Sequence, residues 1–493
     1  MVNSIFSKHF SYRRKSCIIF SRNVAKLLRS LYQGWCFHHN DRINLSKVSS
    51  IYRLPSFTAW RGKIKNNLYL RHLMKLLIKK AKIVDSLSPF NGQITDIFID
   101  NGIIIRISNA ITDQADKIID IDGTHVSPGW VDVFSNFADP GHEFKETLET
   151  GAAAAAAGGY TDVMVIPNTN PVIHNKAGVE YIIQKSKTLP VNIHPVGAIT
   201  KNTEGKELAE MYDMRNSGAI AFSDGINCVQ SSGLLLKALQ YIRSFDGILL
   251  QVPDDKSINP HGLMNEGIIS TQLGLPGKPA MAEELIVARD IKLARYAESR
   301  LHFTGISSKK SIEHIRRAKA SGLAVSCSVT PYHLYFTDTD MQDYDTNLKV
   351  NPPIRTEEDR AALRAAIISG DIDCIATHHL PHEYDSKVVE FEYAKYGMLG
   401  LETSFAVINS AMPGNTAEKW VELLSANPRK LFGLDAATIK EGNNASLTLF
   451  DPSGKWVVGE KSILSKSKNT PFIGKELTGK VIGIINKNKT VLR

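Results

Sequence analysis

Short apolar runs and segments with a helical pattern alternate through the middle of the chain. Runs typical of buried strands fall at 130–134, 161–166, 191–197, 218–222, 247–251, 300–304, 323–329 and 372–376. Helical patterns lie between them, at 143–157, 176–187, 204–215, 231–244, 281–298, 308–321 and 357–369. This alternation indicates a parallel α/β fold, and eight candidate strands favour a closed (β/α)8 TIM barrel over an open sheet. The chemistry of such a barrel lies where its strands end, at the C-terminal face.

Both flanks of this region carry a different, β-rich pattern. Before it, short runs at 75–84, 96–100 and 102–107 are separated by turn residues, and Asn101-Gly102 is a strong hairpin signal. After it, 446–450, 455–458 and 480–485 again predict short strands. We therefore expect a small β-domain built from both chain ends, 74–127 and 439–493, beside a barrel at 128–438.

The composition is that of a soluble globular protein, with 43% hydrophobic and 22% charged residues among 493. No apolar run reaches the roughly 18 residues that a membrane-spanning helix needs, so we expect no integral membrane protein. The five cysteines lie far apart without a CxxC pair, which excludes a disulfide scaffold and a cysteine-rich zinc site. This use of cysteine is typical of a reducing compartment and predicts a cytoplasmic protein.

The net charge of +9 is unevenly distributed along the chain. Residues 1–73 contain 6 Lys and 8 Arg against one acidic residue, Asp41, whereas 74–493 contain 45 basic and 49 acidic residues. The mildly acidic body argues against nucleic-acid binding. The basic segment fits an organellar transit peptide or an arm that contacts nucleic acid or membrane. We favour a leader outside the fold, because Met74 opens a well-patterned strand segment.

Several long motifs lie at or near the predicted strand ends. They include Pro128-Gly-Trp-Val-Asp-Val-Phe-Ser-Asn-Phe-Ala-Asp-Pro-Gly141, Lys145-Glu-Thr-Leu-Glu-Thr-Gly151, Asn347-Leu-Lys-Val-Asn-Pro-Pro-Ile-Arg355, Ile375-Ala-Thr-His-His-Leu-Pro-His382 and Asn427-Pro-Arg-Lys-Leu-Phe-Gly433. The motifs resemble those of dihydroorotases of the bacterial long-chain type, within the amidohydrolase superfamily, and the resemblance extends over 74–493. It implies an amidohydrolase barrel and, in the family, a zinc centre that hydrolyses dihydroorotate reversibly.

The chain departs from this family pattern at the end of the first barrel strand. The family has His-x-His there, because two imidazoles on alternate strand residues hold one metal pair. These positions are Phe134 and Asn136 in this sequence, and neither residue is a good zinc ligand. The Arg that binds the substrate carboxylate in the family is Ala138, and a methyl group cannot replace a charged bidentate clamp.

The departures continue along the barrel. By the resemblance, the next two His ligands correspond to Gln251 and Gly305, and the catalytic Asp, both ligand and general base, corresponds to His378. The bridging acid of the family is retained as Asp224. The resemblance therefore implies a degenerate site with no bound zinc, although zinc is the cofactor of the active family.

Some positions that contact substrate in the family do match. Asn168 and Asn351 align with amides that bind the pyrimidine ring, His382 aligns with a substrate-contact His, and Tyr396-Gly397 aligns with a backbone contact. These residues predict a residual binding pocket. The alternative is structural, because Asn beside Pro at a strand end commonly caps loop backbone.

Histidines in one loop raise the question of a rebuilt metal site. His378, His379 and His382 lie close in sequence, and His333 is a further candidate. Three imidazoles can bind zinc, but the opposite wall offers only Asn136 and Gln251. We favour a cluster that faces solvent or packs a loop.

Two functions follow from these observations. The first is a non-catalytic dihydroorotase homologue of pyrimidine biosynthesis, a pseudoenzyme that acts as a scaffold or regulatory partner, because without metal there is no activated water. Inactive chains of the family are scaffolds for aspartate transcarbamoylase, so the resemblance implies that enzyme or another pyrimidine-pathway protein as partner, and a homodimer as the assembly. The second is an active dihydroorotase or other hydrolase of cyclic amides with a variant site, in which His378 or Asp224 acts as the base.

Overall fold

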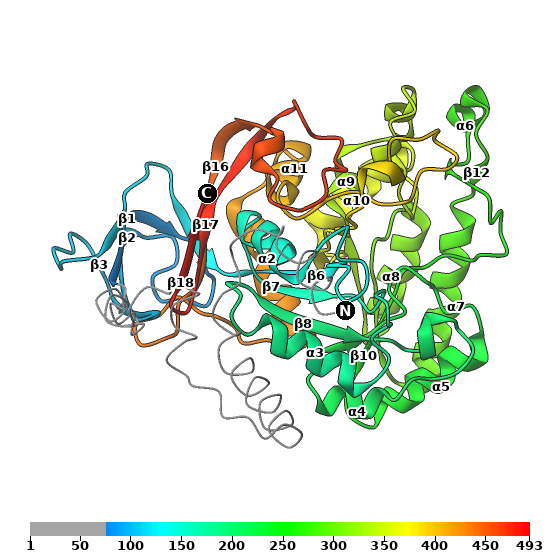
Figure 1. The fold of residues 1–493 in the computed structure, drawn as a ribbon, viewed down its shortest axis with the longest axis horizontal. Coiled ribbons are helices and arrows are strands. Elements are labelled where there is room, and N and C mark those ends of the chain that lie inside the picture. Colours follow the sequence, from blue (N-terminus) through cyan, green and yellow to red (C-terminus); the bar gives the residue numbers. More distant parts are fainter. Residues whose placement is uncertain (1–74) are drawn as a thin grey trace, which may run out of the picture. The chain divides into compact units, whose positions relative to one another are not determined.

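The computed structural model describes residues 75–493, and the expectations for residues 1–73 lie outside the described residues. Among the described residues no helix is long and apolar enough to cross a membrane. Two eight-stranded sheets account for most of the strands (Figure 1).

The first sheet is a parallel, nearly closed barrel. Its strands run in sequence order from β6 (Trp130–Ser135) through β7 (Tyr160–Val165), β8 (Asn192–Gly197), β9 (Ala221–Phe222), β10 (Ile248–Gln251), β13 (Arg300–Phe303) and β14 (Val325–Val329) to β15 (Cys374–Ile375). A parallel bridge between Ser135 and His379 brings the last strand segment beside the first. The (β/α)8 barrel expected from the sequence is confirmed.

Helices follow the strands. Seven of the eight overlap predicted segments, but the helix expected at 204–215 begins only at Met211, and the helix Ser404–Ala411 was not predicted. The helices are α2 (Leu148–Ala157), α3 (Lys176–Ser186), α4 (Met211–Asn216), α5 (Ser232–Arg243), α7 (Met281–Ala297), α8 (Lys309–Ala320), α10 (Glu357–Ser369) and α11 (Ser404–Ala411). Side chains of Asn175, Ser231, Ser308 and Thr356 cap the first turns of α3, α5, α8 and α10 by accepting from backbone N–H groups. These caps explain why the predicted and observed helix starts agree within a residue or two at these four positions.

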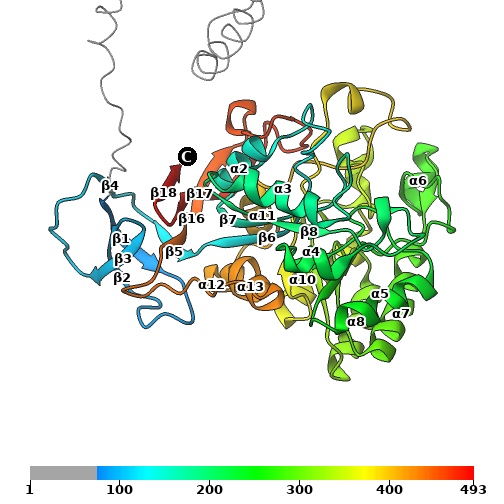
Figure 2. The ribbon, with the colours of Figure 1, turned by 60° about the horizontal axis from the view of Figure 1, so that its bottom comes forward.

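The second sheet joins the two ends of the described chain. Its order is β18 (Lys489–Leu492), β17 (Glu476–Asn486), β16 (Ser446–Val457), β5 (His125–Pro128), β1 (Lys75–Ile83), β2 (Ile94–Asp100) and β3 (Ile103–Ser108), with β4 (Lys117–Ile119) on β1. Figures 1 and 2 both show β1–β3 at the end of the molecule away from α5 and α7, with β16 and β17 between them and the barrel. The small β-domain built from both chain ends is confirmed.

The differences from the predicted elements are local. The helix expected at 143–157 begins at Leu148, because Thr147 caps it and the preceding residues form turns. The two strands expected at 446–450 and 455–458 are one strand, β16, whose pairing with β17 is interrupted between Asp451 and Lys455. The irregularity at Pro452-Ser-Gly454 produced the apparent break in the sequence pattern.

Buried polar contacts connect the N-terminal ends of the barrel strands. We call this end the barrel base. Arg429, on α13 (Asn427–Phe432), is 4% exposed and donates to the carboxylate of Asp162 at 2.7 Å and to the carbonyl oxygen of Gly129 at 2.8 Å. His194 contacts the other oxygen of Asp162 at 2.9 Å. Burial alone would raise the pKa of Asp162, but the His194 hydrogen bond and the Arg429 charge outweigh burial and hold it well below its ordinary value.

Candidate functional site

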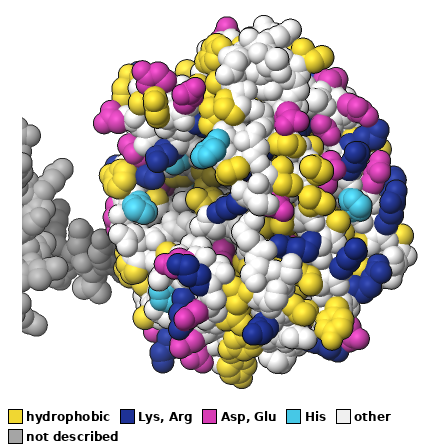
Figure 3. Space-filling model, turned by 90° about the vertical axis from the view of Figure 1, so that its right-hand side faces the viewer, with side chains coloured by type: hydrophobic (Ala, Val, Ile, Leu, Met, Phe, Trp, Pro, Cys, Tyr) yellow, Lys and Arg dark blue, Asp and Glu magenta, His cyan; other side chains and the backbone are white. Residues whose placement is uncertain are grey.

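Two neighbouring cavities, which we call lobes, lie at the C-terminal ends of the barrel strands, the barrel mouth. The apolar lobe has a volume of about 330 Å³ and the polar lobe about 310 Å³, and both are lined by Ile226, Leu380 and Tyr396. We call the two lobes together the mouth cavity. Figure 3 views the side toward which β6 points in Figure 1, where basic, acidic and hydrophobic side chains are interspersed.

Three positions singled out by the sequence meet below the apolar lobe. The Phe134 ring, which is 0% exposed, stacks on the His378 imidazole with a centroid distance of 4.3 Å. A Cβ atom at Gly305 would lie 2.5 Å from Cε1 of His378, and Gly305 has a φ of +73°. The Phe134 and His378 rings therefore fill the space between these strand ends, and Gly305 leaves room for the imidazole.

His378 is also tied into a hydrogen-bonded chain inside the barrel. Its Nε2 lies 2.8 Å from Oγ1 of Thr304, which accepts at 3.0 Å from the Ser328 hydroxyl, and Ser328 in turn lies 3.0 Å from Nε2 of His302. Burial lowers the pKa of His378 and of His302 to about 3 in each case. Both imidazoles are therefore neutral near pH 7, and the Nε2 lone pair or proton of His378 is committed to Thr304.

Asp224 and Gln251, two further predicted site residues, bind the protein itself and do not line the mouth cavity. One carboxylate oxygen of Asp224 accepts from the backbone N–H groups of Ile199 and Thr200, each at 2.9 Å, and its other oxygen accepts from the Thr200 hydroxyl. Burial raises the pKa of Asp224 to about 6. Gln251 accepts from the Val229 N–H at 3.3 Å and donates to Asp290.

These residues do not fit a zinc ion. Zinc needs three or four nitrogen, sulfur or carboxylate ligands that converge on one point. Phe134 and Gly305 offer no donor atom, and Asn136 uses its side-chain oxygen to accept from the Ala138 N–H at 2.7 Å. Within residues 75–493, no group of three or more His, Cys, Asp or Glu side chains is placed to hold a metal ion.

The histidines of the 378–382 loop diverge. His378 and His379 are buried, so of the two arrangements expected for this cluster, facing solvent or packing a loop, the second describes them. Nδ1 of His379 faces the Gly400 N–H at 3.3 Å, and its Nε2 lies 3.5 Å from the Glu146 carboxylate. His382 donates from Nε2 to the Tyr396 carbonyl oxygen at 2.9 Å. His333 does not join the other histidines around one point. Its ring nitrogens contact the Thr330 hydroxyl and the carbonyl oxygens of Pro352 and Pro353.

The predicted substrate-contact residues lie around the mouth cavity. Asn168 and His382 line the polar lobe, Asn351 lines the apolar lobe, and Tyr396 lines both. Asn168 also donates to the Asp224 carbonyl oxygen at 3.1 Å and accepts from the Ile226 N–H, which is the loop-capping role expected of Asn beside Pro. Gly397 has a φ of +129° and lies against Leu380 and His382. Their role in binding stays a prediction.

Four charged residues of the cavity were missed by the sequence reasoning. Asp254 and Lys278 form an ion pair at 2.7 Å in the apolar lobe, which Lys256 also lines, and Lys145 lines the polar lobe. Asp254 follows β10 by three residues, so its position after a strand end was an available signal. Lys278 comes from β12 (Gly277–Lys278), whose approach to the mouth depends on the folded loop.

Buried lysines fix the loop that carries Tyr396. Lys349 donates to the Phe391 and Glu392 carbonyl oxygens, and Lys387 donates to those of Lys395 and Gly397. Burial lowers the pKa of Lys349 to about 8 and that of Lys387 to about 7. The shared wall of the two lobes therefore rests on polar contacts inside the protein.

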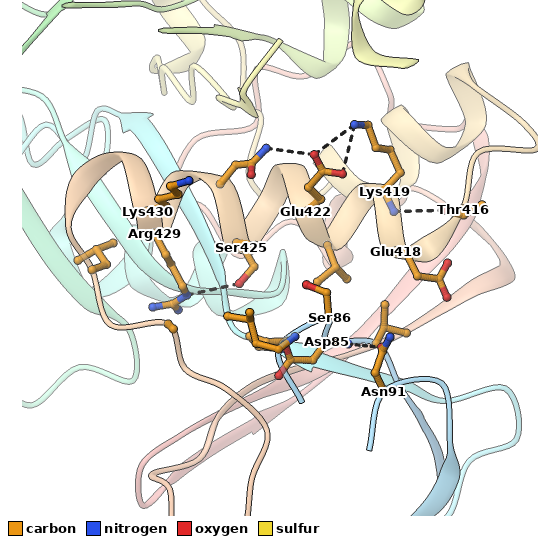
Figure 4. Close-up of a pocket in the computed structure, with 18 residues that line it drawn as sticks. Asp85, Ser86, Asn91, Thr416, Glu418, Lys419, Glu422, Ser425, Arg429 and Lys430 are labelled. Carbon is orange, nitrogen blue, oxygen red and sulfur yellow. Dashed lines mark hydrogen bonds and ion pairs between the residues drawn. The ribbon is translucent and has the colours of Figure 1, made fainter. Parts of the chain in front are cut away.

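A larger cavity of about 720 Å³ lies near the barrel base, between the 84–91 turn and the helical segment 416–430 (Figure 4). Most of its charged groups already have partners: Lys419 binds Glu422 at 3.2 Å, and Arg429 binds Gly129 and Asp162. The π-helical turn Glu422–Ala426 precedes Pro428, which has no N–H to continue an α-helical ladder. This cavity belongs to the packing of the base and presents no set of free groups that converges on a ligand.

The barrel and its companion sheet define the class of protein. The structure superposes on L-hydantoinase (dihydropyrimidinase) from Arthrobacter aurescens with a TM-score of 0.75 and 24% identity, covering 85% of this chain and 96% of that one. A D-hydantoinase structure gives a TM-score of 0.73. At this identity the similarity shows the fold alone, which is the TIM-barrel fold of the amidohydrolases.

Sequence comparisons narrow the class to a family. Residues 123–311 match the family described as dihydro-orotase-like, and residues 255–491 match the amidohydrolase family. Dihydroorotase of Syntrophus aciditrophicus is 39% identical over 423 residues, covering 85% of this chain and 99% of that protein. Dihydroorotase of Geobacter metallireducens is 40% identical over 426 residues, covering 85% of this chain and all of that protein. The chain belongs to the dihydroorotase family of amidohydrolases.

Proposed function

We propose that this chain is a non-catalytic member of the dihydroorotase family that works as a scaffold or regulatory partner in pyrimidine biosynthesis. The observation that carries the proposal is the packing of Phe134 and His378 against Gly305 at the strand ends. Side chains occupy the space that a catalytic centre needs, and two of the three positions supply no ligand atom.

The acid–base groups near the cavity support this proposal. A general base must reach its substrate with a free lone pair and a pKa near the working pH. His378 is buried and bonded to Thr304, and the pKa of its imidazole is lowered by burial to about 3. Asp224 has both carboxylate oxygens occupied by backbone N–H and hydroxyl donors. Neither residue is free to take a proton from water in the mouth cavity.

The partner follows from family resemblance alone. Inactive dihydroorotase-like chains serve as scaffolds for aspartate transcarbamoylase, so we propose that enzyme, or another protein of the same pathway, as the partner and a homodimer as the assembly. A cytoplasmic location is part of the same proposal.

The test is turnover of dihydroorotate and of carbamoyl aspartate by the purified full-length chain, together with gel filtration alone and after mixing with aspartate transcarbamoylase. The proposal expects no turnover in either direction and co-elution with the transcarbamoylase. Turnover in either direction would overturn the non-catalytic role, and separate elution would overturn the transcarbamoylase as partner.

An active cyclic amidohydrolase with a variant site is the alternative, and the persistence of an apolar lobe of about 330 Å³ favours it. In that case His378, the ionisable group that lines this lobe where the family has its base, would carry the reaction. His378→Ala would then abolish hydrolysis of a cyclic amide or imide. If His378→Ala leaves every measured activity unchanged, the variant-site alternative fails.

A further inference from the structure

We propose that the segment 383–397 at the barrel mouth is a proton-sensitive lid, folded around two buried lysines that have no counter-charge. This segment carries Tyr396, which lines both lobes of the mouth. The inference goes beyond the proposed function and does not depend on it, because it concerns access to the lobes whether or not the chain catalyses a reaction. It is carried by a contrast among the buried cations of the described chain.

The buried cations of the described residues are of two kinds. Arg429 donates to the Asp162 carboxylate at 2.7 Å, and Arg355 likewise faces a buried glutamate. Lys349 and Lys387 are 2% and 5% exposed, yet neither forms an ion pair with any described residue. Each of these lysines therefore places a positive charge in the interior without a carboxylate to offset the cost of removing it from water.

Both unpaired lysines hold the lid. Lys387, within the lid, donates to two lid carbonyl oxygens at 2.8 and 3.1 Å. Lys349, outside the lid, donates to two further lid carbonyl oxygens at 2.8 and 2.9 Å, and its ammonium lies 4.8 Å from the centroid of the Tyr396 ring. The four carbonyl oxygens belong to Lys395, Gly397, Phe391 and Glu392. The closed lid is thus folded around two ammonium groups.

The lid has little regular structure of its own. Its one helical element is the short 3-10 turn Tyr384–Ser386. Phe391 is buried, whereas Tyr384, Val388 and Tyr393 are between 59% and 74% exposed. A segment with few buried apolar side chains and no helix or strand ladder opens at a lower free-energy cost than the barrel core.

The charged groups around the two ammonium groups do not offset their burial. Burial is the largest influence, and it lowers the pKa of Lys387 to about 7 and that of Lys349 to about 8. Asp345 faces Lys387 and Glu392 faces Lys349, and each raises the pKa of its neighbour. Lys395 lowers the pKa of Lys349, which in turn lowers that of Lys387.

These positions give the direction of the pH effect. In the open lid water solvates both ammonium groups, and their pKa values return to about 10.5. The open form therefore binds more protons than the closed form between about pH 10 and 7, so a fall in pH through this range favours opening. His382 and Tyr396, two further titratable groups beside the lysines, stay neutral, because burial lowers the pKa of His382 to about 4 and raises that of Tyr396.

The experiment is hydrogen–deuterium exchange of the full-length chain at pH 8.5 and 7.5, read by mass spectrometry as protection factors, which correct for the intrinsic exchange rate. We expect protection in the lid to fall by about tenfold or more between these two values. The comparison loop 109–116, which contains no lysine, should change by less than about threefold. Unchanged protection in the lid, or equal changes in the two loops, would overturn the proposal.

One variant assigns the effect to a lysine. Lys387→Met removes the ammonium with the lower pKa, so the pH dependence of the lid should shrink to about threefold over the same interval, the part due to Lys349. Lys292→Met, at an exposed position on α7, is the matched control and should keep the full dependence. Equal dependence in the two variants would contradict the role of Lys387.

Lys387→Arg provides a second reading if Lys387→Met lowers the melting temperature of the chain. The guanidinium keeps its charge and its N–H donors, and it does not lose its proton between pH 8.5 and 7.5. The pH dependence of the lid should therefore again shrink to about threefold. A dependence of tenfold or more in this variant would show that proton loss from Lys387 does not control the lid.

Discussion

The two ends of the barrel differ in how completely their polar groups are satisfied. At the base, Arg429 and Asp162 are both about 5% exposed at the side chain and are surrounded by further partners, including Gly129 and His194. At the mouth, the Lys278–Asp254 pair is about twice as exposed, and one oxygen of Asp254 has no partner among the described residues. The polar groups of the base are paired with one another and hold the strands together, whereas the mouth keeps a buried acceptor atom without a partner among the described residues.

This contrast explains how the chain keeps the family fold with changed residues at the mouth. The contacts that fix strand starts lie at the base and do not involve Phe134, Gly305 or His378. The mouth positions pack on one another, so a change at one is compensated by its neighbour: Gly305 gives space to His378, which stacks on Phe134. Separating fold-holding from site-forming residues is typical of (β/α)8 barrels.

The largest effect should come from the base. Arg429→Met leaves the carboxylate of Asp162 buried without its main counter-charge, and we expect a loss of about 3–5 kcal/mol in the free energy of unfolding. The measurement is chemical denaturation of the full-length chain. Lys430→Met, the exposed neighbour, is the control and should change stability by less than about 0.5 kcal/mol. Equal effects of the two variants would contradict the role assigned to the base.

Two substitutions test the packing of Gly305 against His378: one adds a side chain at position 305, and the other removes the imidazole that it would meet. Gly305→Ala should cost about 2–3 kcal/mol, because the new Cβ atom meets the imidazole and φ is +73°. In a His378→Ala background the steric part disappears, so the same change should cost about 1 kcal/mol, the backbone part alone. The double-mutant cycle measures this difference. Strict additivity would show that the two residues do not compete for space.

An ion pair at the mouth should matter less than the one at the base. Lys278→Met should cost about 1–2 kcal/mol, because Asp254 keeps a hydrogen bond from Asn351 at 3.2 Å and is closer to water than Asp162. The denaturation assay used for Arg429→Met gives the comparison directly. A loss as large as that of Arg429→Met would remove the distinction between the two ends.

Lowering the pH below about 6.5 should reduce the free energy of unfolding through His378 at the mouth. The pKa of His378 is lowered to about 3 by burial, so between pH 6.5 and about 3 the unfolded chain binds a proton that the folded chain does not. The contribution of His378 to the free energy of unfolding should therefore fall by about 1 kcal/mol from pH 6.5 to 5.5. His378→Gln should flatten the stability profile by this amount, and His261→Gln, at an exposed position, should not. An unchanged profile in His378→Gln would contradict a neutral buried imidazole.

The sequence predicted the architecture well and the site only in part. Strand and helix order followed from periodicity, because buried parallel strands and capped helices leave strong local signals such as Ser308 before α8. The replaced positions were visible as Phe134 and Gly305, but their contact with His378 joins segments far apart in sequence. Asp254 could have been found from its position three residues after β10, whereas its pairing with Lys278 depends on the fold of the loop after β10.

The most direct test of the central claim is the zinc stoichiometry of the full-length chain after dialysis against micromolar zinc, measured by plasma mass spectrometry alongside dihydroorotate turnover. The account predicts no retained zinc above the level of a protein-free dialysis blank, with no turnover. Retention of one or more zinc ions per chain together with turnover would contradict it, because the strand ends would then hold a catalytic centre that Phe134 and His378 should exclude.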